Sequence, residues 1–351
     1  MRSESYDEKK TVLGIIGGGN VGRIHAKDIV TSVPEAKLRY VADAYPDAYN
    51  EWAKANGRPE AVTDYKTILN DPEVDAVLIC APASLHGQLI QECARAGKHV
   101  FCEKPIDYSI EAIKEAIRTA KACKIKLQLG YNRRFDHNHA TARRMVAEGK
   151  IGEVRQIKIT SRDPLPPPPE YFAAVGGSAG GMFLDTSIHD FDMARFMACG
   201  AEVTEVYATG SAMINKDQET TGGVDTTSVI LKFDSGAMAI IDNCWQCAYG
   251  YDQRIEVFGS TGAVNVANDT ASTVVLANEE GQTAEKPLFF YVNRYIASYT
   301  DEIHEFIDAI VNDKPVPVNA KDGYYSVLIA KACDISLKEK RVVTMAEMLA
   351  L

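Results

Sequence analysis

Short apolar runs alternate with amphipathic stretches along the first third of the chain. The expected strands cover residues 11–19, 37–44, 75–82, 99–105 and 125–131, and most of them are apolar on both faces. The expected helices between them cover residues 21–29, 45–57, 84–97 and 109–123. Strands of this kind, separated by helices, are typical of right-handed βαβ units and a parallel sheet covered on both faces. The pattern therefore predicts an α/β fold that begins with a Rossmann domain.

The pattern changes after about residue 150. Expected strands at 152–163, 203–214, 226–233, 237–246 and 252–260 are separated mainly by turn signals, and expected helices cover 180–199, 299–311 and 323–338. Such a run of strands favours an α+β domain with an open, mainly antiparallel sheet. We therefore expect a disordered tail at 1–10, an NAD-binding Rossmann domain at 11–130, and a substrate-binding and oligomerisation domain at 131–351.

Composition and charge exclude several classes of partner. The chain has 351 residues, a formal net charge of -10 and eight cysteines. A negative overall field repels nucleic acid and anionic lipid, and no apolar run approaches the ~20 residues that span a bilayer. We expect neither a nucleic-acid nor a membrane partner. Most cysteines have apolar neighbours, which favours reduced, buried thiols in a cytoplasmic protein.

A glycine-rich loop follows the first expected strand and opens the first expected helix. Its residues are Gly17, Gly19, Asn20, Val21 and Gly22. In a G-x-G-x-x-G loop the first glycine permits the turn, the second lets the backbone approach a pyrophosphate, and the third allows close packing. The helix N-terminus adds a favourable dipole. Asp43 ends the second strand, where an acid binds the ribose hydroxyls and repels a 2′-phosphate, so we predict NAD as the cofactor.

Further cofactor contacts are expected where later strands end. Ligands of open α/β sheets bind at the carboxyl ends of the strands. The residues at these ends are Ala81, Pro82, Ser84, His86, Glu103 and Lys104. We expect all of them to face the cofactor cleft.

The expected helix at 180–199 carries ionisable residues among apolar ones. Asp185 and His189 are four apart and Asp192 follows three later, so a continuous helix places them on one face. Buried ionisable groups are unfavourable unless they are paired or functional. The stripe predicts a substrate site, although a helix-start carboxylate with a satisfied histidine is a structural alternative. An Asp–His–Asp metal site is a further alternative. We predict no metal, because Lys104 in the same pocket would oppose a cation.

These residues resemble the glucose–fructose oxidoreductase, inositol dehydrogenase and rhizopine-catabolism (Gfo/Idh/MocA) superfamily. The resemblance rests on "GGGNVGRIHA", "APASLH", "EKP" and "GYNRRFD" and covers nearly the whole chain. Within the superfamily, "RDPLPPPPEY", "GGMFLDTSIHDFDMARF" and "YGYD" look most like the inositol 2-dehydrogenase branch. The resemblance implies subunits that pair through the C-terminal sheet, as dimers or tetramers.

The resemblance also implies roles for individual residues. Lys104, Asp185 and His189 would act on the substrate alcohol, with His189 as the general base. The other residues expected to bind a polyol are Asn132, Arg133, Asp163, Asp192 and Tyr251. Asn132 departs from the branch, which often has methionine there.

The implied reaction is NAD-dependent oxidation of a secondary hydroxyl of a cyclitol, myo-inositol or scyllo-inositol, to the inosose. Two alternatives stay open at this point. One is a related dehydrogenase or reductase of an aldose or keto-sugar, and the other is a non-catalytic NAD-dependent sensor on the same scaffold.

Overall fold

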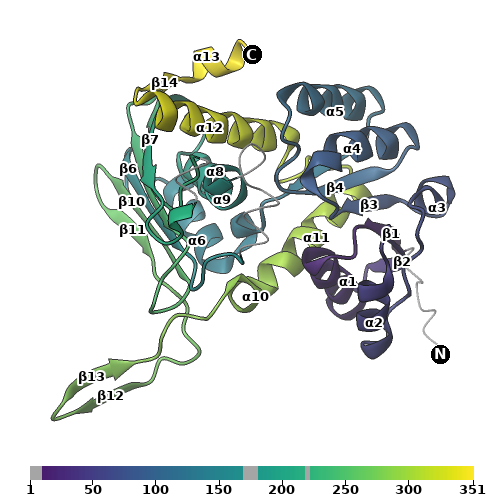
Figure 1. Ribbon diagram of the computed structural model, residues 1–351, viewed down its shortest axis with the longest axis horizontal. Coiled ribbons are helices and arrows are strands. Elements are labelled where there is room, and N and C mark those ends of the chain that lie inside the picture. The colour runs from purple at the N-terminus through teal and green to yellow at the C-terminus, as the bar shows by residue number, and fades with distance from the viewer. Residues whose placement is uncertain (1–9, 169–180, 218–221) are drawn as a thin grey trace. The chain divides into compact units, whose positions relative to one another are not determined.

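The computed structural model describes residues 10–168, 181–217 and 222–351. The chain divides into two compact units (Figure 1). The N-terminal unit runs to Asn132 and also contains Ala297–Tyr324, whereas the C-terminal unit comprises Arg133–Ile296 and Tyr325–Leu351.

The N-terminal unit is built on a five-stranded parallel sheet with the order β2-β1-β3-β4-β5. The strands are β1 (Thr11–Ile16), β2 (Ala36–Ala42), β3 (Ala76–Ile79), β4 (His99–Glu103) and β5 (Leu127–Gly130). The helices are α1 (Asn20–Ser32), α2 (Asp47–Ala55), α3 (Lys66–Asn70), α4 (His86–Arg95) and α5 (Ile110–Ala122), with a 3-10 turn at Ala83–Leu85. The predicted Rossmann fold is confirmed. Residues such as Leu13, Ile15 and Leu78 are fully buried because helices cover both faces of the sheet.

A helix from late in the chain belongs to this unit. Helix α11 (Ile296–Val311) places Ile303, Phe306 and Ile307 in the same buried core as the residues of β1. Apolar positions three and four apart give this helix one apolar face, which the first sheet buries. The expected second domain at 131–351 is therefore interrupted, because residues 297–324 return to the first unit.

The C-terminal unit contains a seven-stranded sheet with the order β11-β10-β6-β9-β8-β7-β14. The strands are β6 (Val154–Arg162), β7 (Val203–Ser211), β8 (Thr226–Phe233), β9 (Met238–Cys244), β10 (Asp252–Gly259), β11 (Ala263–Val266) and β14 (Val343–Thr344). Strands β6 and β9 pair in parallel and the other neighbours are antiparallel. The expected mainly antiparallel sheet is confirmed.

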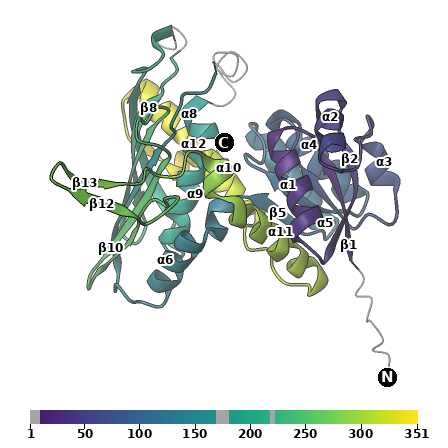
Figure 2. The same ribbon diagram turned by 90° about the horizontal axis from the view of Figure 1, so that it is seen from below.

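Helices of this unit lie along one face of the sheet (Figure 2). They include α6 (His137–Ala147), α8 (Gly181–Asp185), α9 (Ile188–Met197) and α12 (Ala320–Glu339), which starts in the other unit. Short helices α10 (Tyr291–Arg294) and α13 (Met345–Leu349) also belong to this unit. Several large apolar side chains of the strands are nevertheless exposed: Tyr207, Ile230, Met238, Ile240 and Phe258. In β8, Ile230 is exposed while Val229 and Leu231 are buried, as expected for a sheet with one uncovered face.

A two-stranded hairpin extends from this unit (Figure 1). Its strands are β12 (Val275–Asn278) and β13 (Gly281–Ala284), and all of their residues are exposed. The sequence pattern did not predict it.

Two further expectations concern the cysteines and membranes. All eight cysteines are free thiols, but Cys123 and Cys199 are exposed, so the expectation of buried thiols holds for only part of the set. Among the described helices, none combines the length and hydropathy that a membrane crossing needs.

Candidate active site

The glycine loop joins β1 to α1 in a conformation that only glycine fits at two positions. Gly17 has φ +105, and a Cβ there would lie 2.5 Å from the backbone of Cys80. A Cβ on Gly22 would lie 2.0 Å from the carbonyl oxygen of Gly17. A Cβ on Gly19, in contrast, would meet no heavy atom of the described chain within 4 Å beyond Gly19 and the adjoining backbone. The loop therefore packs tightly at Gly17 and Gly22 and leaves open space at Gly19, as a bound pyrophosphate requires.

Asp43 lies just after β2 and contacts the same loop. Its Oδ2 accepts a hydrogen bond of 2.7 Å from the backbone N–H of Gly18, and its Oδ1 accepts one of 2.8 Å from Tyr45. These bonds fix the carboxylate beside the loop and orient its remaining lone pairs. The position is the one at which Rossmann domains bind the ribose hydroxyls.

His86, which we expected to face the cofactor cleft, fixes the segment after β3. The ring of His86 is buried between two carbonyl groups, with Nε2 2.7 Å from the oxygen of Ala81 and Nδ1 2.7 Å from that of Pro105. Burial lowers the pKa of His86. The side chain thus links the two turns that follow β3 and β4. Pro82 and Ser84 are exposed on the first of these turns.

The end of β4 carries the E-K-P motif. Glu103 is buried and its Oε1 lies 2.7 Å from Nε2 of His25. Lys104 follows directly, is half-buried and precedes a cis peptide bond to Pro105. Lys104 and the buried Asn132 belong to the N-terminal unit.

The helix expected at 180–199 is interrupted, which corrects one prediction. Helix α8 ends at Asp185 and α9 begins at Ile188, so Asp185 and His189 do not lie on one continuous helix. The backbone N–H of Ser187 bonds to the carbonyl of Met182, which closes α8 with a wider turn. Residue 180 and the end of "RDPLPPPPEY", residues 169–171, lie outside the described residues.

Side chains from the sheet hold the break between α8 and α9. Nε1 of Trp245 donates to Oγ1 of Thr186 at 2.7 Å, and Oγ of Ser187 donates to Oδ1 of Asn243 at 2.7 Å. From Met182 to Arg195, the residues that are not fully buried are Asp185 and His189. Their two side chains therefore reach the surface of a segment that is otherwise packed into the unit.

Arg133 has a buried partner that sequence reasoning missed. Its Nη1 donates to Oδ1 of Asp190 at 2.6 Å, while Nδ2 of Asn243 donates to Oδ2 of Asp190 at 2.7 Å. All three side chains are buried. Through Asp190, this network connects the first turn of α9, which also carries His189, to Asn243 of β9 and to Arg133 at the start of the unit. The sequence offered two signals, the adjacent Arg133 and Arg134 and the nearby Asp190 and Asp192. It does not show which arginine forms an ion pair with which aspartate.

Asp192 is also paired within the unit. It is 1% exposed, and Arg134 donates to both of its oxygens, with 2.8 Å between Nε and Oδ2. Tyr251 is buried with its hydroxyl 3.5 Å from Nη2 of Arg133, and burial raises the pKa of Tyr251 well above its usual value. Asp163 follows β6 and is half-buried. Arg133, Tyr251 and Asp190 thus form one cluster, and Asp192 forms a second with Arg134.

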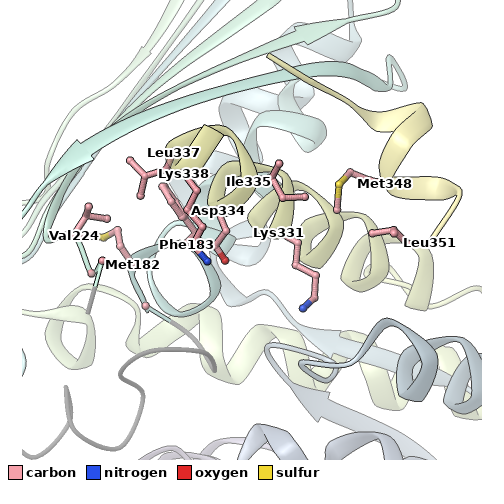
Figure 3. A pocket seen from close by; sticks show the side chains of 13 residues that line it. Met182, Phe183, Val224, Lys331, Asp334, Ile335, Leu337, Lys338, Met348 and Leu351 are labelled. Carbon is pink, nitrogen blue, oxygen red and sulfur yellow. The ribbon is translucent and has the colours of Figure 1, made fainter. Parts of the chain in front are cut away.

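A pocket of about 390 Å³ lies elsewhere in the C-terminal unit (Figure 3). Its walls include Met182 and Phe183 of α8, Lys331 and Asp334 of α12, and Met348 of α13. Neither Asp185 nor His189 lines it, so it is distinct from the predicted substrate site.

Comparison with known families matches both units. The model described as "Oxidoreductase family, NAD-binding Rossmann fold" matches residues 12–131, and "GFO/IDH/MocA C-terminal domain" matches residues 139–265.

Several known proteins are similar over nearly the whole chain. The myo-inositol 2-dehydrogenase of Thermotoga maritima is 41% identical, over 96% of this chain and 99% of its own. The inositol 2-dehydrogenase of Rhizobium meliloti is 41% identical, over 95% and 98%. The crystal structure of scyllo-inositol dehydrogenase from Lactobacillus casei with bound NAD(H) and scyllo-inositol superimposes with a TM-score of 0.88 at 32% identity, covering 96% of this chain and 100% of that one.

Proposed function

Because this chain belongs to the GFO/IDH/MocA family and is an NAD-binding, inositol 2-dehydrogenase-like oxidoreductase, we propose that it oxidises a secondary hydroxyl of a cyclitol. Myo-inositol or scyllo-inositol is the proposed substrate, and the inosose is the product. The main support is the pair Asp185 and His189, which reach the surface from a segment whose other side chains are buried. The names of the relatives agree with such a substrate.

The glycine loop fits the cofactor. Gly17, Gly19 and Gly22 would hold the pyrophosphate and Asp43 the ribose, since the loop is open at Gly19 and the carboxylate is fixed beside it. When bound, NAD accepts a hydride from the carbinol carbon.

We propose that three side chains act on the substrate alcohol. The imidazole of His189 takes the hydroxyl proton, because a histidine titrates near neutral pH. Nζ of Lys104 donates a hydrogen bond to the same oxygen and stabilises its developing negative charge. Asp185 orients these groups. The alcohol thus loses its proton to His189 and its hydride to the cofactor, which leaves a ketone.

Recognition of the remaining hydroxyls is assigned to the polar residues of the C-terminal unit, with Asn132. Arg133 and Tyr251 form a buried cluster and Asp163 is half-buried. Asp192 contributes through its pair with Arg134. A site built on such hydrogen bonds discriminates strongly against deoxy analogues.

We also propose that subunits pair as dimers or tetramers through the uncovered face of the seven-stranded sheet. The exposed Ile230, Met238 and Ile240 support this, because contiguous exposed apolar side chains mark interaction surfaces. Light scattering after size-exclusion chromatography should give a mass above 38.4 kDa. The variant Ile240→Asp should lower that mass, and an unchanged mass would argue against this face.

The function is tested by turnover of myo-inositol, scyllo-inositol and hexoses with NAD and with NADP. We expect both His189→Asn and Lys104→Met to lower kcat by about 10²–10⁴-fold while NAD still binds. The exposed His137 and Lys121 provide matched controls, His137→Asn and Lys121→Met, which should keep wild-type rates. Turnover of hexoses alone would contradict the cyclitol assignment, and no turnover of any polyol would favour a sensor.

A further inference from the structure

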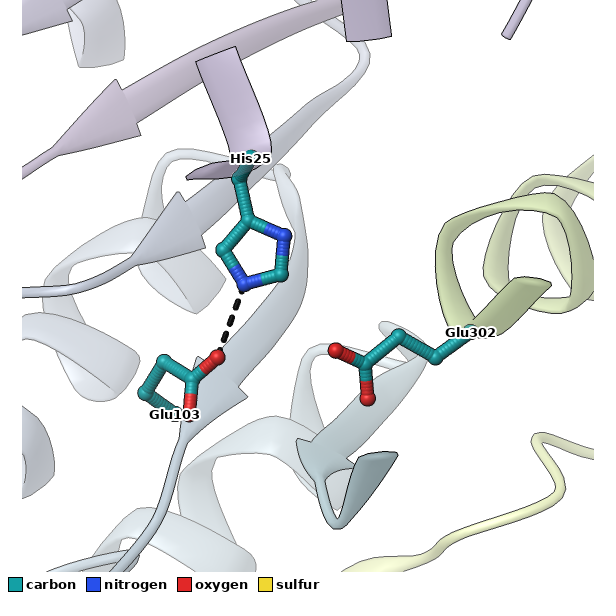
Figure 4. A group of neighbouring side chains, drawn as sticks. All are labelled: His25, Glu103 and Glu302. Carbon is teal, nitrogen blue, oxygen red and sulfur yellow. Dashed lines mark hydrogen bonds and ion pairs between the residues drawn. The ribbon is translucent and has the colours of Figure 1, made fainter. Parts of the chain in front are cut away.

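Three ionisable side chains meet in the core of the N-terminal unit (Figure 4). His25 comes from α1, Glu103 from the end of β4, and Glu302 from α11. His25 and Glu302 are 0% exposed and Glu103 is 8% exposed. One nitrogen or oxygen atom from each lies within 4.8 Å of the others. Nε2 of His25 is 2.7 Å from Oε1 of Glu103, so these two already form a pair.

Glu302 differs from the other two because neither of its carboxyl oxygens has a hydrogen-bond partner. It points toward the His25–Glu103 pair (Figure 4). A buried, unpaired carboxylate is strongly unfavourable, and a second negative charge nearby adds to the penalty. Burial, followed by the charges of Glu103 and Asp28, raises the pKa of Glu302 well above its usual value.

The groups around Glu302 are mostly acidic or neutral. Helix α1 contributes His25 and Asp28. The negative charge of Asp28 raises the pKa of Glu302. The thiol of Cys80, after β3, is itself raised in pKa by burial and then by acidic neighbours that include Glu302. From β5, Nε2 of Gln128 donates to the backbone carbonyl of Glu302. His25 is the one basic group among these neighbours, and Glu103 already accepts its hydrogen bond.

In the structure the Glu302 carboxyl group lies within 4.8 Å of the pair but makes no hydrogen bond to it. We propose that Glu302 keeps its proton, that a rotation of its side chain closes this gap so that it donates a hydrogen bond to Glu103, and that this neutral acid is a positioning residue for Lys104. Oε2 of Glu103 is 3.3 Å from the backbone N–H of Lys104. On its other side, a Cβ on Gly130 would lie 2.9 Å from the Glu103 carboxyl carbon, so the carboxylate has little room to move. A proton shared with Glu302 completes this enclosure and links α11 to the strand end that carries Lys104.

A divalent cation held by the same three residues is the competing occupant. Ligand bonds of about 2.0–2.2 Å place neighbouring donor atoms about 3 Å or more apart. The distance of 2.7 Å between His25 and Glu103 is that of a direct hydrogen bond. The geometry therefore favours a proton over a metal ion.

The variant Glu302→Gln distinguishes the two, because an amide replaces the hydrogen-bond donor of a protonated acid but is a poor ligand for a cation. We expect it to fold and to lack one infrared carbonyl band of a protonated carboxylic acid that the wild type shows at neutral pH. The exposed Glu305 on the same helix provides the control Glu305→Gln, whose spectrum should retain that band. No missing band, or a Gln variant that fails to fold, would overturn the proposal.

The positioning of Lys104 rests on the proposed function and is tested by kinetics. Glu302→Gln should keep the kcat of the wild type, whereas Glu302→Met, which cannot donate, should lower kcat by about 10- to 100-fold with little change in KM for NAD. Equal loss in both variants, together with a stoichiometric metal in the wild type by mass spectrometry, would overturn the proposal in favour of a cation site. The infrared result does not depend on substrate, so a wrong substrate assignment would leave that test intact.

Discussion

The substitution Gly19→Ala should weaken NAD binding without weakening the fold. Gly19 is the N-cap of α1, with φ −67 and ψ −168, a conformation that alanine adopts freely. Beyond Gly19 and the adjoining backbone, no heavy atom of the described residues lies within 4 Å of the added Cβ. The methyl group would therefore occupy only open space, which is where we propose that the pyrophosphate binds.

The size of each effect follows from these contacts. Replacing a capping glycine by alanine costs about 0.5–1 kcal/mol, and lower entropy of the unfolded chain contributes about 0.4–1 kcal/mol in the opposite direction. The Tm should change by only a few degrees. Loss of one backbone hydrogen bond to a charged phosphate costs about 1.5–3 kcal/mol, which raises the Kd for NAD by about 10- to 100-fold.

The assay pairs thermal denaturation with calorimetric titration of NAD, and uses two other glycines for comparison. In Gly22→Ala the Cβ would lie 2.0 Å from the oxygen of Gly17, so the loop must shift and both the Tm and NAD binding should fall. In Gly262→Ala the nearest atom would be 3.7 Å away, in the other unit, and NAD binding should not change. Unchanged NAD affinity in Gly19→Ala, or a large fall in its Tm, would refute the reasoning about this loop.

Three further predictions concern the C-terminal unit. Burial lowers the pKa of His139 to about 4. Between pH 6.5 and 4 the unfolded chain therefore binds a proton that the folded chain does not, and the free energy of unfolding falls on acidification by up to about 3 kcal/mol. Urea denaturation should show that His139→Phe removes this contribution, and a variant with the pH profile of the wild type would contradict it. Asn243→Leu leaves two buried partners unsatisfied, at about 1–3 kcal/mol each, and should lower both the Tm and kcat, because the start of α9 is no longer held. Arg134→Met should destabilise the fold by about 3–5 kcal/mol in the same denaturation assay, since the buried Asp192 loses both hydrogen bonds from Arg134. Adding Asp192→Leu should restore part of that loss, and full additivity would show that the pair does not interact.

Sequence pattern alone was sufficient for the N-terminal sheet and the geometry of its glycine-rich loop. The parallel strands β1, β3, β4 and β5 are mostly buried on both faces, so their apolar runs are easily recognised, whereas the edge strand β2 exposes Lys37. The glycine spacing carries its own local geometry, and the structure shows the tight contacts at Gly17 and Gly22 that this spacing implies. Asp43 lies at a set distance along the same βαβ unit, and the structure places its carboxylate beside the loop, while its role in binding the ribose stays a prediction.

Other features depended on partners that are distant in sequence. The break between α8 and α9, at Thr186 and Ser187, is stabilised by Trp245 and Asn243, more than fifty residues away. The spacing of apolar residues in residues 180–199 is the same for a continuous helix and for a broken one, so it could not predict this break. Helix α11 has one apolar face, but its period cannot say which sheet will bury it. The exposed β12–β13 hairpin lacks the buried alternation by which strands are recognised.

The chemistry divides in the same way. The sequence by itself determined which residue types are present and, through short-range periodicity, which local elements they form. The tertiary structure alone decided that Asp190 pairs with Arg133, that Asp192 pairs with Arg134, and that Glu302 points at Glu103. The physical reason is that a charge buried in a core depends on the groups packed around it, and chain folding brings those groups together from positions 57 to almost 200 residues apart.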